Sequence, residues 1–187
     1  MKIVTLLGSP RADSHSSAIA QRLNDTAAQL GADTQTFALN KMSYRGCQGC
    51  YACKTPLDHC AVKDDLSEAL EAVRNADALV LTTPVYYGDV TAQLKGFIDR
   101  TFAYLKPDFL TNPAPSRLAP KKLVFIITQG HPDENLYADI YQRNATCFTA
   151  IGFTEIHLIR ACGVGPGTTI PEAVMQQAEA TARALMS

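Results

Sequence analysis

The sequence predicts an α/β protein whose core is a five-stranded parallel sheet, doubly wound between two layers of helices, with the strand order 2-1-3-4-5. Two patterns predict this fold. Five short apolar runs alternate with longer stretches in which apolar residues recur at helical spacing. The runs themselves are apolar without interruption, which is typical of strands that are covered on both faces and joined by right-handed crossovers. We expect residues 1–187 to form a single domain.

Turn residues bound the expected elements. Gly8-Ser9-Pro10 stops the first strand, Pro84 closes the third, and Asp64-Asp65 suits the positive end of a helix. The strands are expected at residues 2–7, 34–39, 78–82, 121–128 and 154–159. The helices are expected at residues 16–30, 64–73, 90–105, 135–151 and 171–185. Two stretches lack periodicity, a cysteine-rich insert at 46–63 and a proline-rich loop at 106–120.

The composition excludes several classes of protein. The chain has 47% hydrophobic and 19% charged residues, and its 17 basic and 18 acidic residues nearly cancel. This balance argues against a disordered protein and against a partner such as nucleic acid. No apolar run approaches the roughly 20 residues of a membrane helix. The first residues do not resemble an export signal, so we expect a cytoplasmic protein without a membrane partner.

The loop after the first strand is rich in hydrogen-bond donors. It contains Ser9, Arg11, Ser14, Ser16 and Ser17 just before a helix begins. Serine hydroxyls, free N–H groups and the positive end of a helix favour a phosphate monoester. The alternative is an ordinary capped turn. No nucleoside triphosphatase motif is present, and the late Gly163–Gly167 segment is weak evidence for a dinucleotide site.

The loop after the third strand brings aromatic residues to the same edge of the sheet. Tyrosines beside a rigid proline turn can stack on a flat heterocycle, and glycine lets the backbone approach its rim. The residues are Pro84, Val85, Tyr86, Tyr87 and Gly88. The alternative is a pair of half-buried tyrosines that cap the core. A third polar loop, with Gln129 and Gly130, follows the fourth strand.

These segments resemble one family. Gly8-Ser9-Pro10-Arg11, Thr83-Pro84-Val85-Tyr86-Tyr87-Gly88 and Gln93-Leu94-Lys95-Gly96-Phe97-Ile98-Asp99-Arg100 are similar to motifs of the NADPH-dependent FMN reductase-like branch of flavodoxin-fold proteins. The resemblance implies bound FMN, with Ser9, Arg11, Ser14, Ser16 and Ser17 about the phosphate and ribityl end. It places residues 84–88 along the isoalloxazine, with Gln129 and Gly130 nearby. It also implies NAD(P)H as co-substrate and a homodimer or homotetramer.

Four of the six cysteines fall in the insert. Cys47, Cys50 and Cys53 form C-x2-C-x2-C, and Cys60 follows after six residues. This spacing suits a loop that presents thiolates to a [4Fe–4S] cluster. A zinc site and free or redox-active thiols are the alternatives. The segment resembles that of archaeal-type iron–sulfur flavoproteins, which belong to the same family. Cys147 and Cys162 are expected to be packing residues.

We therefore expect an FMN-dependent oxidoreductase that transfers electrons from NAD(P)H, or from a ferredoxin-like donor, to a quinone, a flavin or another small acceptor. The flavin would do the redox chemistry, so no acid or base residue is assigned. The alternative is a non-enzymatic electron-transfer protein. Asp99 and Arg100 diverge on a helix and are expected to form a surface or interface ion pair.

Overall fold

The computed structural model describes residues 1–187. Five parallel strands form one sheet in the order β2-β1-β3-β4-β5, which confirms the predicted fold class and strand order. The strands are β1 (Lys2–Leu7), β2 (Asp33–Ala38), β3 (Ala78–Pro84), β4 (Lys121–Thr128) and β5 (Phe153–Ala161). The α-helices are α1 (His15–Gln29), α2 (Leu66–Arg74), α3 (Ala92–Arg100), α4 (Asp139–Ala150) and α5 (Glu172–Met186). Short 3-10 turns lie at Leu39–Lys41, Ala52–Lys54 and Thr101–Tyr104.

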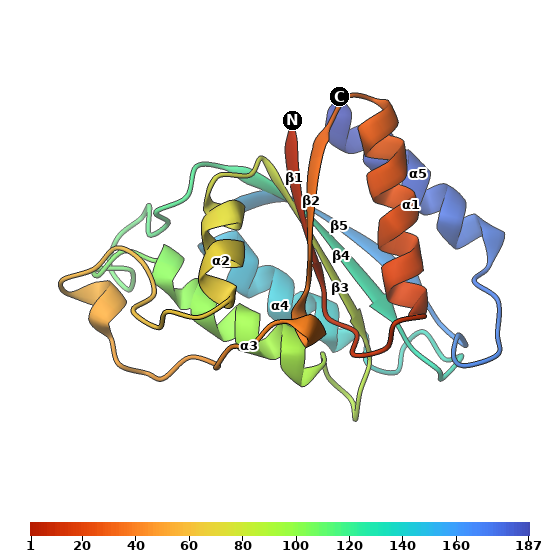
Figure 1. The fold of residues 1–187 in the computed structure, drawn as a ribbon, viewed down its shortest axis with the longest axis horizontal. Helices are drawn as coiled ribbons and strands as arrows, with labels where there is room; N and C mark the ends of the chain where they lie inside the picture. The colour runs from red at the N-terminus through yellow and green to blue at the C-terminus, as the bar shows by residue number, and fades with distance from the viewer.

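The helices cover both faces of the sheet (Figure 1). Helices α1 and α5 pack on one face, and α2, α3 and α4 lie on the other. Alternate strand residues enter the two resulting cores, so Ile3 packs toward α1 and α5 while Val4 packs toward the other layer. The central strands are therefore buried on both faces, which explains their continuous apolar sequence.

Most predicted boundaries lie within two residues of the observed ones, and the third and fourth helices are the exceptions. The third helix is expected to end at Leu105, whereas α3 ends at Arg100 and a 3-10 turn continues over Thr101–Tyr104. The spacing predicts a start at Asn135, whereas α4 begins at Asp139. The intervening residues form a turn in which Asp133 accepts a hydrogen bond from the N–H of Asn135 at 2.9 Å. Tyr137 has a φ of 67°, which no helical residue adopts.

The insert and the proline-rich loop lie together at one end of the molecule, beyond α2 and α3 (Figure 1). Arg117 joins them, because its Nη2 donates to the carbonyl of Cys53 at 3.3 Å. The carboxyl ends of the strands point to a different edge, where the loops after β1, β3 and β4 meet (Figure 1). None of the helices combines the length and the apolar character that crossing a membrane would require.

Candidate functional site

Gly8 fixes the loop after β1 to the elements that follow β3. Its N–H donates to the carbonyl of Thr82 at 2.9 Å, and its own carbonyl accepts from Thr91 Oγ1 at 2.7 Å. A Cβ at Gly8 would lie 2.5 Å from the Thr82 oxygen, so this close approach requires glycine. Thr91 also caps α3, since its Oγ1 accepts from the N–H of Leu94 at 3.3 Å.

The start of α1 offers donors that the chain does not use. Ser14 is the N-cap residue, yet its side chain makes no capping hydrogen bond, and its Oγ lies 2.9 Å from Ser16 Oγ. The N–H groups of His15, Ser16 and Ser17 have no acceptor within the chain. Together with the positive end of the helix, these donors suit a phosphate group.

A cavity of about 140 Å³ lies directly beside these donors. It is bounded by residues of four loops, namely those after β1, β3, β4 and β5. The lining residues are Ser9, Arg11, Ser14, His15, Pro84, Val85, Tyr86, Thr128, Gly130, Val164, Gly165 and Pro166. Seven of them belong to the predicted cofactor-binding set. Four loops far apart in the sequence therefore meet at one cavity, at the switch point of the sheet.

Arg11 borders this cavity with its guanidinium only weakly engaged. Its Nη2 donates to the carbonyl of Asp13 at 3.5 Å, and its Nε lies 3.9 Å from a carboxylate oxygen of the same residue. Its N–H donates to Ser9 Oγ at 3.2 Å, which closes the loop. The guanidinium is thus free to bind an anion in the cavity.

Three predicted residues lie behind or beside the cavity. Ser16 is fully buried, and Ser17 faces a neighbouring depression between α1 and the segment before α5. Gln129 is also buried. Its Nε2 donates to the carbonyls of His131 and Asp133 at 2.9 and 2.8 Å, and its Oε1 accepts from Arg160 Nη2 at 2.5 Å. Gln129 therefore orders the loop that carries the cavity-lining glycine.

The two remaining residues, Tyr87 and Gly88, form the tip of a tight turn. Their φ angles are 49° and 84°, and the N–H and C=O groups of Tyr86 and Asp89 pair across the turn at 2.9 and 3.2 Å. The turn projects from the edge of the sheet (Figure 1). Both tyrosines are exposed, Tyr87 completely, so they do not cap the core as the alternative interpretation held.

Sequence reasoning missed the loop after β5, whose Val164, Gly165 and Pro166 line the cavity. The Gly163–Gly167 segment thus contributes to the cavity wall and is not a dinucleotide motif. The available signal was its position, because the rule that ligands bind beyond the carboxyl ends of strands applies to β5 as it does to β1.

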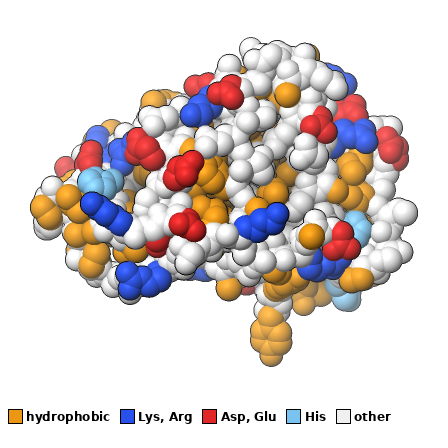
Figure 2. Space-filling model, viewed as in Figure 1, with side chains coloured by type: hydrophobic (Ala, Val, Ile, Leu, Met, Phe, Trp, Pro, Cys, Tyr) orange, Lys and Arg blue, Asp and Glu red, His pale blue; other side chains and the backbone are white.

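The four cysteines of the insert line one largely apolar cavity of about 600 Å³. Phe102, Phe109 and other apolar residues of α3 and the following segment form much of its wall. Figure 2 shows hydrophobic side chains gathered at this end of the molecule. Cys147 of α4 lines the same cavity and is exposed, so the expectation that it is a packing residue is wrong. No three His, Cys, Asp or Glu side chains of the chain are grouped so that they could hold one metal ion.

Lys54 lies beneath this cysteine loop. Its Nζ donates to the carbonyls of Phe102 and Leu105 at 2.5 and 2.6 Å, and it lies 4.1 Å from the centroid of the Phe102 ring. Burial lowers the pKa of Lys54, and the neighbouring Cys53 opposes this shift. Burial raises the pKa of the Cys53 thiol, against the effect of the Lys54 charge.

Arg100 holds both ends of the insert, contrary to the expectation of a surface pair with Asp99. Its side chain is fully buried, and its Nη1 donates to both carboxylate oxygens of Asp64 at 2.6 and 2.8 Å. It also donates to the carbonyls of Arg45 and Val62 at 3.2 and 2.8 Å. Asp99 pairs with Lys95 at the surface instead. Burial opposes ionisation of Asp64, but the hydrogen bond from Arg100 and that from a backbone N–H outweigh it and lower the pKa of Asp64.

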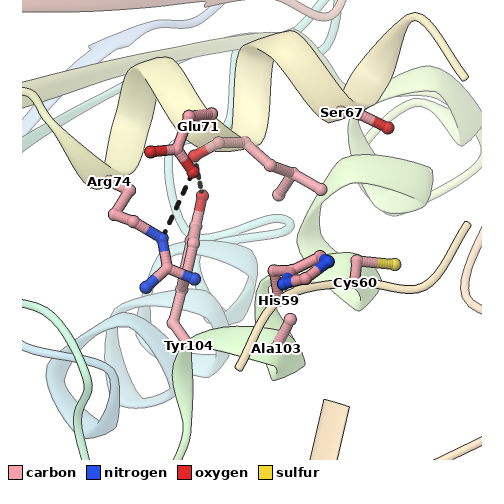
Figure 3. A pocket seen from close by; sticks show the side chains of 8 residues that line it. His59, Cys60, Ser67, Glu71, Arg74, Ala103 and Tyr104 are labelled. Carbon is pink, nitrogen blue, oxygen red and sulfur yellow. Dashed lines mark hydrogen bonds and ion pairs between the residues drawn. The ribbon is translucent and has the colours of Figure 1, made fainter. Parts of the chain in front are cut away.

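Cys60 also borders a smaller cavity of about 100 Å³ between the insert and α2 (Figure 3). Glu71 and Arg74 pair there at 3.4 Å, and the hydroxyl of Tyr104 donates to a backbone carbonyl of α2 at 2.6 Å. Burial raises the pKa of Tyr104 far above its ordinary value, so this hydroxyl stays protonated. In Figure 3 the thiol of Cys60 points away from these polar groups, which leaves it available to the larger cavity.

The fold and the first loop define a flavodoxin-like α/β protein with a phosphate-sized niche at its switch point. The family model of NADPH-dependent FMN reductase matches residues 1–153, and the chain belongs to this family.

Two curated relatives are similar over part of the chain. An iron–sulfur flavoprotein from Methanocaldococcus jannaschii is 34% identical over 101 residues, which is 54% of this chain and 52% of that protein. An iron–sulfur flavoprotein from Methanosarcina thermophila is 33% identical over 109 residues, which is 58% of this chain and 56% of that protein. The chain thus spans about half the length of the curated relatives it matches.

Solved structures share the fold over the whole chain. An NAD(P)H:quinone oxidoreductase from Methanothermobacter marburgensis aligns with a TM-score of 0.72 at 21% identity, covering 100% of this chain and 94% of that one. An FMN-dependent NADH-azoreductase from Bacillus anthracis, in complex with FMN, aligns with a TM-score of 0.73 at 15% identity, covering 100% and 99%.

Proposed function

We propose that this chain is an FMN-dependent oxidoreductase that transfers electrons from NAD(P)H to a small acceptor such as a quinone or a flavin. The observation that carries the proposal is the cavity where the unused donors of α1 meet the loops after β3 and β4. Membership of the NADPH-dependent FMN reductase family supports it. In this proposal residues 1–187 act as one FMN-binding domain.

The residues present fit FMN at its phosphate end. Ser9, Arg11 and Ser14 border the niche, and the free N–H groups at the start of α1 complete a set of donors for a phosphate dianion. Ser16 and Ser17 contribute through their backbone N–H groups. FMN, when bound, supplies the hydride and electron chemistry. The niche would hold the phosphate, and the neighbouring loops would hold the rest of the cofactor.

The loops after β3 and β4 are proposed to hold the ring system. Pro84, Val85 and Tyr86 line the cavity, and Tyr87 and Gly88 continue from them at the tip of the turn. The fully exposed ring of Tyr87 can stack on a flat surface brought against it. Buried Gln129 keeps the neighbouring loop in place, so that its glycine stays at the cavity.

Arg11→Ala tests the phosphate assignment. If Arg11 binds the phosphate, this variant weakens binding of FMN by about 10- to 100-fold, the range that a charge-assisted hydrogen bond provides. Binding of riboflavin, which has no phosphate, is unchanged. Arg22→Ala is the matched control, since Arg22 lies on the same helix and pairs with Glu179 away from the cavity. Equal losses for the two ligands, measured by flavin fluorescence quenching, would contradict the assignment.

We further propose that Cys47, Cys50, Cys53 and Cys60 hold a [4Fe–4S] cluster. Four thiols around one cavity of about 600 Å³ are the donor set that such a cluster takes. Each thiolate would bind a different iron of the cluster, so the four need not meet at a single point. The similarity to proteins named iron–sulfur flavoproteins supports this proposal. Anaerobic purification followed by iron, sulfide and flavin assays on one sample tests it.

A second candidate function is electron transfer between protein partners, with a ferredoxin-like protein as donor. The cysteine cavity favours it, because a cluster exchanges single electrons. Rapid oxidation of NADPH in the presence of a quinone would support the enzyme. Reduction of the protein by a ferredoxin but not by NADPH would support the electron-transfer protein.

The exposed side chains of Tyr51 and Leu110, at the insert end, support a homodimer or homotetramer, which light scattering can measure. We place the protein in the cytoplasm, where cysteines remain reduced.

A further inference from the structure

Lys54 is a buried cation without an acidic partner. The residue is 8% exposed, and its Nζ donates to the backbone carbonyls of Phe102 and Leu105. Its remaining electrostatic neighbours are the thiols of Cys53 and Cys47 and the guanidinium of Arg117. Carbonyl oxygens and an aromatic ring compensate part of the lost hydration, but they carry no net charge.

A second cation lies on the same side of the insert. Arg117 donates to the carbonyl of Leu105 at 3.0 Å and to that of Cys53 at 3.3 Å, and its other side lines a separate open cavity with Asp58 and Asp108. Both cations therefore bind backbone atoms next to the cysteine loop. Removing a charge from water is unfavourable unless an opposite charge is near. Because buried Lys54 follows Cys53 directly and has no carboxylate partner, its charge points to an anion in the cavity that the thiols line.

We propose that Lys54 is the fixed countercharge of the cysteine site and a positioning residue for the group bound there. Its hydrogen bonds to Phe102 and Leu105 attach the middle of the insert to the segment after α3. The inference rests on the proposed [4Fe–4S] cluster. Uptake of one electron makes the cluster and its four thiolates more negative by one charge, and no proton leaves Lys54. Its ammonium group stabilises this reduced state more than the oxidised state, and so it raises the reduction potential.

The test compares neutral and charged replacements of Lys54 in the full chain, reconstituted anaerobically with iron and sulfide. Lys54→Met keeps an aliphatic side chain against the Phe102 ring but removes the charge, and Lys54→Arg keeps the charge. Lys63→Met is the matched control, because Lys63 ends the same insert but is exposed to solvent. The readout is the midpoint potential of the cluster, from a dithionite titration followed by electron paramagnetic resonance.

Lys54→Met is expected to lower the equilibrium constant for reduction of the cluster by about tenfold or more. This corresponds to a midpoint potential lower by at least about 59 mV for one electron. Lys54→Arg is expected to restore most of the wild-type potential, and Lys63→Met to change it by less than a third as much. A purely structural role for Lys54 would change stability and leave the potential of the loaded protein in place. An unchanged potential in Lys54→Met therefore overturns the inference while the proposed cluster stands.

Two further outcomes are decisive. If Lys54→Met loses its iron, Lys54→Gln serves as the second neutral variant, since its amide can donate to the same carbonyls. Loss of iron from both neutral variants but not from Lys54→Arg supports the countercharge, and loss from all three overturns it. A wild-type protein that takes up no iron overturns the proposed cluster and this inference together, whereas the FMN-dependent activity is unaffected by that result.

Discussion

Arg100 is the residue whose replacement the structure predicts to be most disruptive outside the core. Its side chain is completely buried, and Asp64, its only acidic partner, is 14% exposed. Arg100→Met keeps a side chain of similar volume but leaves the carboxylate of Asp64 without its countercharge. Removing one member of a buried ion pair costs about 3–5 kcal/mol. For a chain of this length, such a loss lowers Tm by roughly 6–20 °C.

The adjacent residue provides the control. Asp99 forms an exposed pair with Lys95 one helical turn away, and Asp99→Asn is expected to cost less than about 1 kcal/mol. Urea denaturation of both variants beside the wild type measures the free energies of unfolding. Limited proteolysis gives a second readout. Arg100 holds the backbone on both sides of the insert, so cleavage within residues 46–61 is expected to become faster in Arg100→Met only.

The cost of Arg100→Met is also expected to depend on pH. The folded-state pKa of Asp64 lies below its ordinary value of 3.8, so its contribution is fully present above that value and is lost as the pH falls through the folded-state pKa. The difference in stability between wild type and variant is therefore constant near neutral pH and shrinks as the pH falls into the acid range. A cost no larger than that of Asp99→Asn, or one that grows in acid, would refute the role assigned to this pair.

Two further predictions concern the loops at the carboxyl edge of the sheet. Thr91→Ala removes both the cap of α3 and the hydrogen bond to the Gly8 carbonyl. It is expected to lower the free energy of unfolding by about 1–3 kcal/mol in a denaturation experiment, and Thr91→Ser is expected to restore most of that loss. An unchanged free energy would show that neither bond contributes. Tyr87 has a φ of 49°, a left-handed backbone conformation that asparagine adopts more readily than tyrosine. Tyr87→Asn is therefore expected to raise Tm by about 2–4 °C in calorimetry. A lower Tm would mean that the exposed tyrosine ring has contacts in solution.

The strands could be predicted almost completely from the sequence because their signal is local. A continuous apolar run such as Leu123–Ile127 is buried on both faces only between two layers, and the observed β4 has the bounds predicted for the strand that contains it. The strand order followed from the alternation of elements. The start of α4 was less predictable, because the left-handed backbone of Tyr137 follows from the turn before the helix rather than from the spacing of apolar residues.

The part of the site that could be predicted consists of residues that directly follow neighbouring parallel strands. Ser9, Pro84 and Gly130 meet at one cavity because parallel strands end at one edge. The partner of Arg100 could not be predicted, since 36 residues separate it from Asp64 and adjacent Asp99 offers an equally plausible charge. Tertiary packing decides that choice, because Arg100 faces the insert from the buried side of α3 while Asp99 faces solvent.

Helix α3 links the two proposed redox sites. At its first turn, Thr91 binds the carbonyl of Gly8 and so fixes the loop beside the phosphate niche. At its last turn, Arg100 binds both ends of the insert, and the residues just beyond it accept the hydrogen bonds of Lys54. A helix of nine residues rises roughly 14 Å at about 1.5 Å per residue. Because both attachments belong to one short, packed helix, a change at either end of α3 is expected to displace the loop or the insert that is attached there.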